Sequence, residues 1–223
     1  MQKFERKPLE DAYLRAHRAR LRLNGFRRRV RRFERAEFDA AEIKLFPEPN
    51  VPFQFGRPDN PIPRNYPIAI GEIIYNLRAA LDYLVFDLAA FDSGIEQNGT
   101  QFPIEDTEQG FRRHMKTYLR GINSGHIASI ERLQPYNGCE WTKRFRSLSN
   151  PDKHRRLTHA THNTGLTAEI NPADSPFPKG GTNIKLEISI FISFQDGTPI
   201  IQTLNEFVKQ VTNTLGTFKP DFD

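Results

Sequence analysis

The first third of the chain contains eight small or apolar residues at alternating steps of three and four. They are Leu9, Ala12, Ala16, Ala19, Leu23, Phe26, Val30 and Phe33. This spacing places all eight on one face of an α-helix, so we expect a helix over residues 8–35 with that face buried. Pro8 suits the first turn of such a helix. Asn24-Gly25 predicts a bend or a break, because glycine costs up to ~1 kcal/mol within a helix.

Arginines occupy much of the remaining surface of this predicted helix. Ten of them lie between residues 12 and 35: Arg15, Arg18, Arg20, Arg22, Arg27, Arg28, Arg29, Arg31, Arg32 and Arg35. Glu34 is the only acidic residue there, so the segment carries a net charge of +9 and the rest of the chain −4. The chain is therefore basic in one element, although its overall net charge is only +5.

The guanidinium group binds phosphate through two parallel hydrogen bonds, so an arginine-rich helix is typical of a surface that contacts RNA or DNA backbones. The arginines we expect at such a surface are Arg20, Arg27, Arg28, Arg29, Arg31 and Arg32. Two other interpretations stay open. The arginines could be solvated or paired with acidic residues of the same chain, or they could face an acidic protein or lipid.

Residues 71–91 form a second predicted helix, with nine apolar residues on a wide face, and we expect it at the centre of the core. A strand is predicted over 38–46. The segment 47–67 contains seven prolines and is interpreted as a connecting segment. Shorter helices are expected from Asp106, which would act as a cap with Gln109, to about Leu119, over 124–133 and over 141–148. A further helix is expected to start at Asn150, as its cap, and Pro151.

The last third of the chain changes from helical to strand periodicity. Residues 183–194 alternate strictly, with Ile or Leu at every second position and Phe194 at the end, which predicts a half-buried strand. Asp196-Gly197 indicates a hairpin turn that would pair 198–201 with this strand. Leu204, Phe207, Val208, Val211 and Leu215 predict a C-terminal helix. We therefore expect an α+β fold and a single domain over 1–223, with an antiparallel helical bundle around the 71–91 helix, a small antiparallel sheet and the C-terminal helix.

Several classes of protein are excluded by what the sequence lacks. No apolar run is long enough to span a bilayer, and residues 1–8 lack the apolar core of a signal peptide. Cys139 is the only cysteine, so no internal disulfide is expected, and we expect a cytoplasmic protein. The chain has no phosphate-binding loop, no GxGxxG and no GxSxG. We expect no cofactor. His154, His159 and His162 have no acidic residue among them, so no metal site is expected.

Two polar clusters need an explanation. Asn76, Arg78 and Asp82 lie on the 71–91 helix, where they could bind a substrate or could form a network that fixes the helix register. The segment 152–156 follows the predicted Asn150 cap. There His154 could act as a general acid or base, with Lys153 and Arg155 stabilising negative charge, or the segment could be an exposed basic turn.

Three segments together resemble a group of uncharacterised bacterial proteins. The first, from Gly71 to Leu84, contains Asn-Leu-Arg-Ala-Ala-Leu-Asp; the second is Phe102-Pro103-Ile104; the third is Asn150-Pro151-Asp152-Lys153-His154-Arg155-Arg156-Leu157. The resemblance implies a bacterial source and no particular reaction. It also implies that the two polar clusters belong together. If their helices pack against each other, Asp152 joins Asn76, Arg78 and Asp82 in one polar cluster.

A second resemblance is to HEPN-type helical ribonucleases, which place an arginine and a histidine four to six residues apart on a helix. Arg156 and His162, and also Arg120 and His126, have this spacing. The polar residue that commonly follows the arginine is absent, since Leu157 and Gly121 stand there.

We therefore expect a non-enzymatic protein that binds nucleic acid through the arginine helix. One alternative is a metal-independent HEPN-like ribonuclease using His154, Lys153 and Arg155. Another is an interaction protein that docks an acidic partner. The sequence leaves open whether the chain forms a homodimer.

Overall fold

The structure is a computed structural model that describes residues 7–45, 53–56, 60–154, 160–171 and 183–222. Most of these residues are helical. The chain divides into two compact units. The first comprises Met1–Gly25, Asn65–Thr158 and Ile201–Asp223, and the second comprises Phe26–Arg64 and His159–Ile200. The single domain over 1–223 stays a prediction.

Helix α1 (Glu10–Asp39) confirms the arginine-rich helix. The first seven residues of the apolar stripe are buried and Phe33 is half-buried. The predicted break at Asn24-Gly25 is wrong, because α1 continues through it with Leu23 and Phe26 fully buried on either side. Burial of these two side chains, about 1.5–3 kcal/mol each, outweighs the cost of one helical glycine.

The predicted strand over 38–46 starts too early. Helix α1 extends to Asp39, and strand β1 begins only at Glu42. Glu37 explains the longer helix, since it continues the steps of three and four after Val30 and Phe33. Its side chain is buried and its Oε1 accepts a hydrogen bond of 2.7 Å from Asn60. Glutamate is a polar residue type, so the apolar pattern in the sequence stopped at Phe33 and did not predict the last turn of the helix. In the structure Glu37 can be buried because its carboxylate is hydrogen-bonded.

Helix α2 (Asn65–Ser93) is the central helix of the first unit, as predicted, but it begins six residues earlier than expected. Tyr66, Ala69 and Ile70 are buried and extend its apolar face. Pro67 lies in the first turn, where its missing N–H breaks no helical hydrogen bond. The end of the proline-rich segment is therefore helical.

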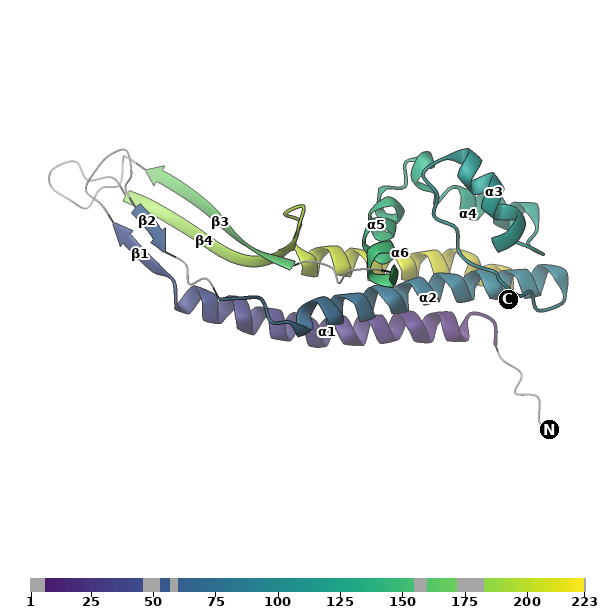
Figure 1. The fold of residues 1–223 in the computed structure, drawn as a ribbon, viewed down its shortest axis with the longest axis horizontal. Helices are drawn as coiled ribbons and strands as arrows, with labels where there is room; N and C mark the ends of the chain where they lie inside the picture. Colours follow the sequence, from purple (N-terminus) through teal and green to yellow (C-terminus); the bar gives the residue numbers. More distant parts are fainter. Residues whose placement is uncertain (1–6, 46–52, 57–59, 155–159, 172–182, 223) are drawn as a thin grey trace, which may run out of the picture. The chain divides into compact units, whose positions relative to one another are not determined.

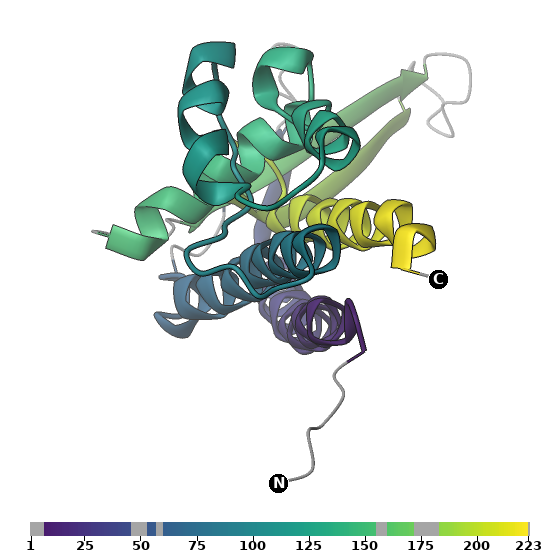
Figure 2. The ribbon, with the colours of Figure 1, turned by 90° about the vertical axis from the view of Figure 1, so that its right-hand side faces the viewer.

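Figures 1 and 2 show α2 beside the first part of α1 and beside α6 (Ile200–Phe218), with the short helices on the opposite side of α2 from α1. Helices α1 and α2 run antiparallel. The Leu9 N–H bonds Asp87 at 2.7 Å, and Arg22 pairs with Glu72 at 3.0 Å. The mostly helical chain thus forms a helical bundle in this unit, and α6 confirms the predicted C-terminal helix with all five of its predicted core residues buried.

The short helices of the first unit are α3 (Glu108–Tyr118), α4 (Ser124–Glu131), η1 (Pro135–Asn137), α5 (Glu140–His154) and η2 (Lys219–Phe222). Asp106 is not the cap of α3. Thr107 caps it by accepting from the Gly110 N–H at 3.1 Å, and Asp106 instead pairs with Arg146 of α5. Threonine is also a favourable cap, and its use here leaves the Asp106 carboxylate available for a tertiary ion pair.

Helix α5 also corrects the sequence prediction. It is continuous from Glu140 to His154, so Asn150 does not cap a new helix. Pro151 lies in its last turn, where a proline removes a single helical hydrogen bond. Phe145 of α5 is fully buried and meets Phe207 of α6 edge-on, with ring centroids 5.1 Å apart. This aromatic pair anchors the short helices to the long ones.

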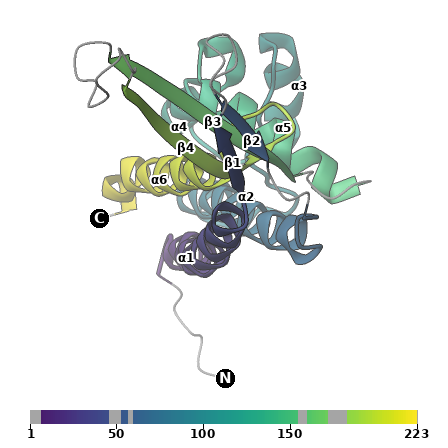
Figure 3. The ribbon, with the colours of Figure 1, turned by 90° about the vertical axis from the view of Figure 1, so that its left-hand side faces the viewer.

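The second unit contains two antiparallel ribbons, drawn in Figure 3. Strand β1 (Glu42–Leu45) pairs with β2 (Phe53–Gly56), and β3 (Ala160–Asn171) pairs with β4 (Asn183–Phe194). Within the described ranges the strands form two separate two-stranded ladders, and the one small sheet expected from the sequence is not present. Glu34 of α1 accepts a 3.2 Å hydrogen bond from the Ile192 N–H, which joins α1 to β4.

Strand β4 has the predicted bounds, but its partner is β3 and not residues 198–201. The Asp196-Gly197 turn is present, with Gly197 at φ 82° and the Thr198 N–H bonded to Asp196 at 3.0 Å. The return strand is limited to a bridge between Ser193 and Pro199, because α6 begins at Ile200. Ile200 and Leu204 are buried on one face of α6, and this burial stabilises a helix where the turn signal had predicted a return strand.

The entry into α1 depends on one carboxylate. Leu9 has a φ of 64°, and Asp87, which is 7 % exposed, holds its N–H. Replacing Asp87 with alanine would leave this buried N–H without that acceptor. We expect the free energy of unfolding to fall by about 2 kcal/mol, as for other hydrogen bonds to charged groups. Urea denaturation measures this loss. Asp87→Asn keeps an acceptor oxygen and should lose less than half as much; equal losses in both variants would contradict the assignment.

Candidate functional site

The arginine face of α1 lies opposite the buried stripe. Arg18, Arg20, Arg22, Arg28, Arg31, Arg32 and Arg35 are exposed, and Arg15, Arg27 and Arg29 are half-buried. Within the second unit, the exposed Arg28, Arg31 and Arg32 stand three and four residues apart, so they lie on one side of the helix.

Some of these arginines have partners in the chain. Arg22 pairs with Glu72 at 3.0 Å, and Arg35 pairs with Asp39 at 3.0 Å. Arg15 lies over the ring of Tyr83 and Arg29 over that of Phe26, each at 5.7 Å from the ring centroid. The intramolecular interpretation therefore accounts for part of the arginine face.

Several of the exposed arginines have no ion-pair partner among the described residues. Arg20, Arg28 and Arg32 make no ion pair with any residue in the described part of the chain. Arg31 lies near Glu34, and its positive charge acts on the pKa of this carboxyl group. Burial raises the pKa of Glu34, and the Ile192 hydrogen bond and Arg31 lower it. Glu34 therefore bonds the backbone of β4 and is the acidic neighbour of Arg31.

A small pocket lies at Arg20 in the first unit, between α1 and α6. It encloses about 260 Å³ and is lined by Arg20, Leu23, Asn24, Asn205, Val208, Lys209, Thr212 and Asn213. The lining contains two cations and three asparagine amides but no carboxylate. Such a set of donors is suited to an anionic oxygen, because each group can donate to it and none repels it.

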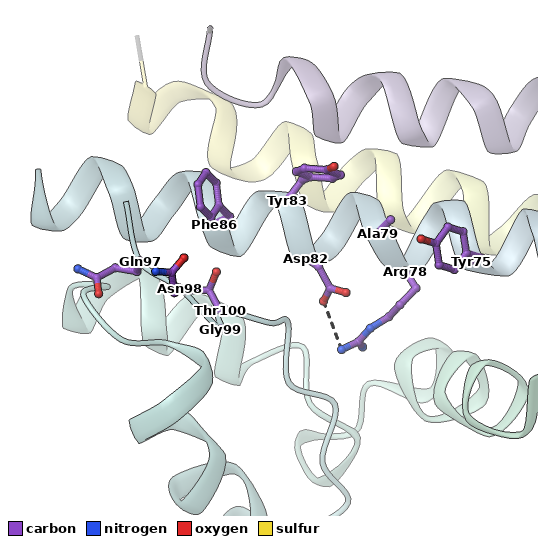
Figure 4. Close-up of a pocket in the computed structure, with 10 residues that line it drawn as sticks. All are labelled: Tyr75, Arg78, Ala79, Asp82, Tyr83, Phe86, Gln97, Asn98, Gly99 and Thr100. Carbon is purple, nitrogen blue, oxygen red and sulfur yellow. Dashed lines mark ion pairs between the residues drawn. The ribbon is translucent and has the colours of Figure 1, made fainter. Parts of the chain in front are cut away.

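Of the polar residues singled out on α2, the structure brings Arg78 and Asp82 together. Arg78 and Asp82 lie 3.4 Å apart, one helical turn from each other (Figure 4). Asn76 instead donates to the Glu72 carbonyl of its own helix at 2.7 Å. The side chain of Asp152 lies outside what the structure describes, so its place in the cluster stays a prediction.

The Arg78–Asp82 pair holds the backbone of Phe102 from both sides. The Phe102 N–H donates to Asp82 Oδ1 at 2.9 Å, and the Phe102 carbonyl accepts from Arg78 Nη2. The ring of Phe102 is fully buried. Two of the three segments singled out in the sequence thus meet here, because the α2 pair fixes the Phe102-Pro103-Ile104 segment.

Arg78 is 8 % exposed, and its Nε has no hydrogen-bond partner among the described residues. Burial lowers the pKa of this guanidinium, and the charge of Asp82 raises it in part. A buried cationic donor without a partner is costly, and in native proteins such a group calls for an explanation.

Arg78 and Asp82 also line a feature that the sequence did not reveal, a pocket of about 360 Å³ that we term the α2 pocket. Its other lining residues are Tyr75, Ala79, Tyr83, Phe86, Gln97, Asn98, Gly99 and Thr100 (Figure 4). The signal that could have indicated it is the set of three aromatic residues on the otherwise polar side of α2. Packing of α2 in the core does not account for these three rings, because they lie away from its buried face.

The side chains proposed as catalytic lie outside the part of the chain that the structure describes. Arg155 and His159 lie outside the described residues, and so do the side chains of Lys153, His154 and His162. The ribonuclease hypothesis built on His154 stays a prediction.

Of the two HEPN-like pairs, only Arg120 and His126 can be located. The His126 ring is engaged on both nitrogens, with Asp92 at 2.8 Å from Nδ1 and Asp221 at 3.3 Å from Nε2. Asp92 also accepts from the Asn123 backbone and side chain, each at 2.8 Å. This network ties the start of α4 to the end of α2, which is a structural use of the histidine.

Neither a metal site nor a membrane span is found in the described ranges. They contain no group of three or more His, Cys, Asp or Glu side chains able to hold a metal ion, and no helix long and apolar enough to cross a bilayer. In comparisons with known proteins, no protein-family model, no curated protein and no solved structure matches the chain.

Proposed function

We propose that the chain binds the phosphate backbone of RNA or DNA through the exposed arginines of α1. The observation that supports this most is the set of solvent-facing arginines opposite the buried stripe, Arg28, Arg31 and Arg32 above all. The stripe holds α1 in place, so the charges are presented on a rigid helix and not on a mobile tail.

A phosphate backbone fits this surface better than a single small anion does. Positions 28, 31 and 32 extend along the helix and are not gathered into one concave site, and successive phosphates of a strand are similarly spread out. The carboxylate-free pocket at Arg20 and Lys209 adds a place in the first unit where one phosphate oxygen can be held.

The salt dependence of binding tests this proposal. The triple variant Arg28→Gln, Arg31→Gln, Arg32→Gln removes three solvent-facing charges without touching the buried stripe. Each arginine that no longer neutralises a phosphate lowers the slope of log K against log salt by about 0.7–0.9, so we expect the slope to fall by roughly 2–3. Fluorescence anisotropy with a labelled RNA over a series of salt concentrations measures it.

The matched control replaces three exposed arginines outside α1. Arg112, Arg113 and Arg120 are exposed in the first unit, and their change to glutamine alters the net charge equally. This control should keep most of the slope. If both triple variants bind RNA like the unmodified chain, or show the same decrease in slope, the α1 arginines are not the binding surface.

A further inference from the structure

The α2 pocket has the size and the lining of a ligand site and takes no part in the proposed backbone contacts. Its volume of about 360 Å³ lies within the range of ~300–1,000 Å³ that ligand pockets occupy. One side is aromatic and the other is polar, so a ligand that fits has a flat apolar face and an edge with hydrogen-bonding groups.

The aromatic side comes from α2 alone. Tyr75, Tyr83 and Phe86 lie along one side of the helix, and Tyr75 is 57 % exposed. The face of the exposed Tyr75 ring is therefore open for stacking. Flat heterocycles stack on such rings, and nucleobases do so whatever their identity.

The polar side comes from the 97–100 loop and from the base of the pocket. Gln97 and Asn98 carry amides, each of which both donates and accepts. Arg78 contributes the buried Nε that has no partner in the described chain. Figure 4 shows Arg78 and Asp82 on the side of α2 that faces this loop. Amide and guanidinium groups are those that pair with base edges in nucleic-acid complexes.

One arginine of α1 lies beside an aromatic residue that lines the pocket. Arg15 lies over Tyr83, and Arg22 pairs with Glu72 at the other end of the same stretch of α2. Residues 15, 18 and 22 share one helix face, and Arg18 is exposed. A phosphate attached to a base that lies near Tyr83 would therefore be close to the Arg15 guanidinium.

We propose that the α2 pocket takes one unpaired nucleobase, stacked on Tyr75 and hydrogen-bonded to Arg78 and the 97–100 loop. The inference rests on the proposed function in naming nucleic acid as the source of the base. It adds that the chain selects single strands, because a base within a duplex has no free face or edge to offer.

The test uses ligands with and without phosphate. Binding of adenosine and uridine is measured by saturation-transfer NMR, and binding of a short RNA is measured by anisotropy as a single strand and as a duplex. Tyr75→Ala removes the stacking ring. Phe91→Ala is the control, since Phe91 is similarly exposed on α2, at 53 %, but lies outside the pocket.

We expect the unmodified chain to bind the nucleosides and to prefer the single strand. Tyr75→Ala should weaken nucleoside binding at least about fivefold, the lower bound for removing one base stack, and should reduce the preference for the single strand. Phe91→Ala should change neither. No nucleoside binding at millimolar concentration, or equal losses in the two variants, overturns the pocket.

The two proposals fail in different ways. The Arg28/Arg31/Arg32 triple variant should lose RNA affinity and retain nucleoside binding, because nucleosides carry no phosphate. Salt-dependent RNA binding with no nucleoside binding leaves the proposed function standing and removes the pocket. Nucleoside binding that depends on Tyr75, without RNA binding, keeps the base site and overturns the nucleic-acid function.

Discussion

Replacing Asp82 with alanine is expected to lower the free energy of unfolding by about 3 kcal/mol, because it leaves a buried guanidinium without its counter-charge. Arg78 is 8 % exposed, and Asp82 lies 3.4 Å from it. The same substitution removes the acceptor of the Phe102 N–H. Urea denaturation followed by circular dichroism measures the loss, and hydrogen exchange at Phe102 reports the freed N–H separately.

A double-mutant cycle shows whether the pair is the cause. Arg78→Met removes the buried charge and keeps much of the side-chain volume. If the uncompensated charge dominates, the Arg78→Met, Asp82→Ala double variant should be destabilised by clearly less than the sum of the two single variants. Additive losses would mean that Asp82 acts through Phe102 alone, and a loss below 1 kcal/mol for Asp82→Ala would contradict both effects.

The second large effect is expected where α5 packs against α6. Phe207→Ala should lower the free energy of unfolding by about 3–5 kcal/mol, because it opens a cavity at a ring that is 1 % exposed. Its partner Phe145 is fully buried, with the ring centroids 5.1 Å apart and the rings nearly perpendicular. The loss is measured by thermal and urea denaturation of the first unit's helical signal.

Two controls test this prediction, one at the partner ring Phe145 and one at an exposed ring. The Phe145→Ala, Phe207→Ala double variant should fall short of additivity by about 0.5–1.5 kcal/mol, the coupling typical of an aromatic pair. Phe38→Ala, at an exposed ring of α1, should change the free energy of unfolding by less than 1 kcal/mol. A Phe207→Ala loss no larger than that of Phe38→Ala would show that α6 does not depend on this packing.

Long periodic elements could be predicted from the sequence because each repeats one physical signal many times. The α1 stripe, most of the α2 core face, the bounds of β4 and the C-terminal helix appear as predicted, although Phe91 of the predicted α2 face is exposed. The predictions were wrong where a single residue determines where a helix begins or ends. Glu37 extends α1 against its polar character, and Ile200 starts a helix where a turn signal favoured a strand.

The candidate sites divide in the same way. The sequence located the α1 arginines off the buried stripe, since a helix that buries one face must present the opposite one. Which of them face solvent and which pair within the chain, as Arg22 does with Glu72, was decided by the structure. The polar residues of α2 did not follow so simply. Asn76, Arg78 and Asp82 look like one cluster along the chain. In the structure, however, Asn76 donates to a carbonyl of its own helix, whereas Arg78 and Asp82 form hydrogen bonds with the backbone of Phe102.

The sequence by itself determined which faces of the long helices are buried and where the positive charge accumulates, because both depend on spacing within one element. Only the tertiary structure decided what the polar groups do. Phe102 is 20 residues from Asp82, and this hydrogen bond brings the segment that follows the 97–100 loop against α2. Hydrogen bonds and pockets depend on distances between separate elements, and local periodicity carries no information about those distances.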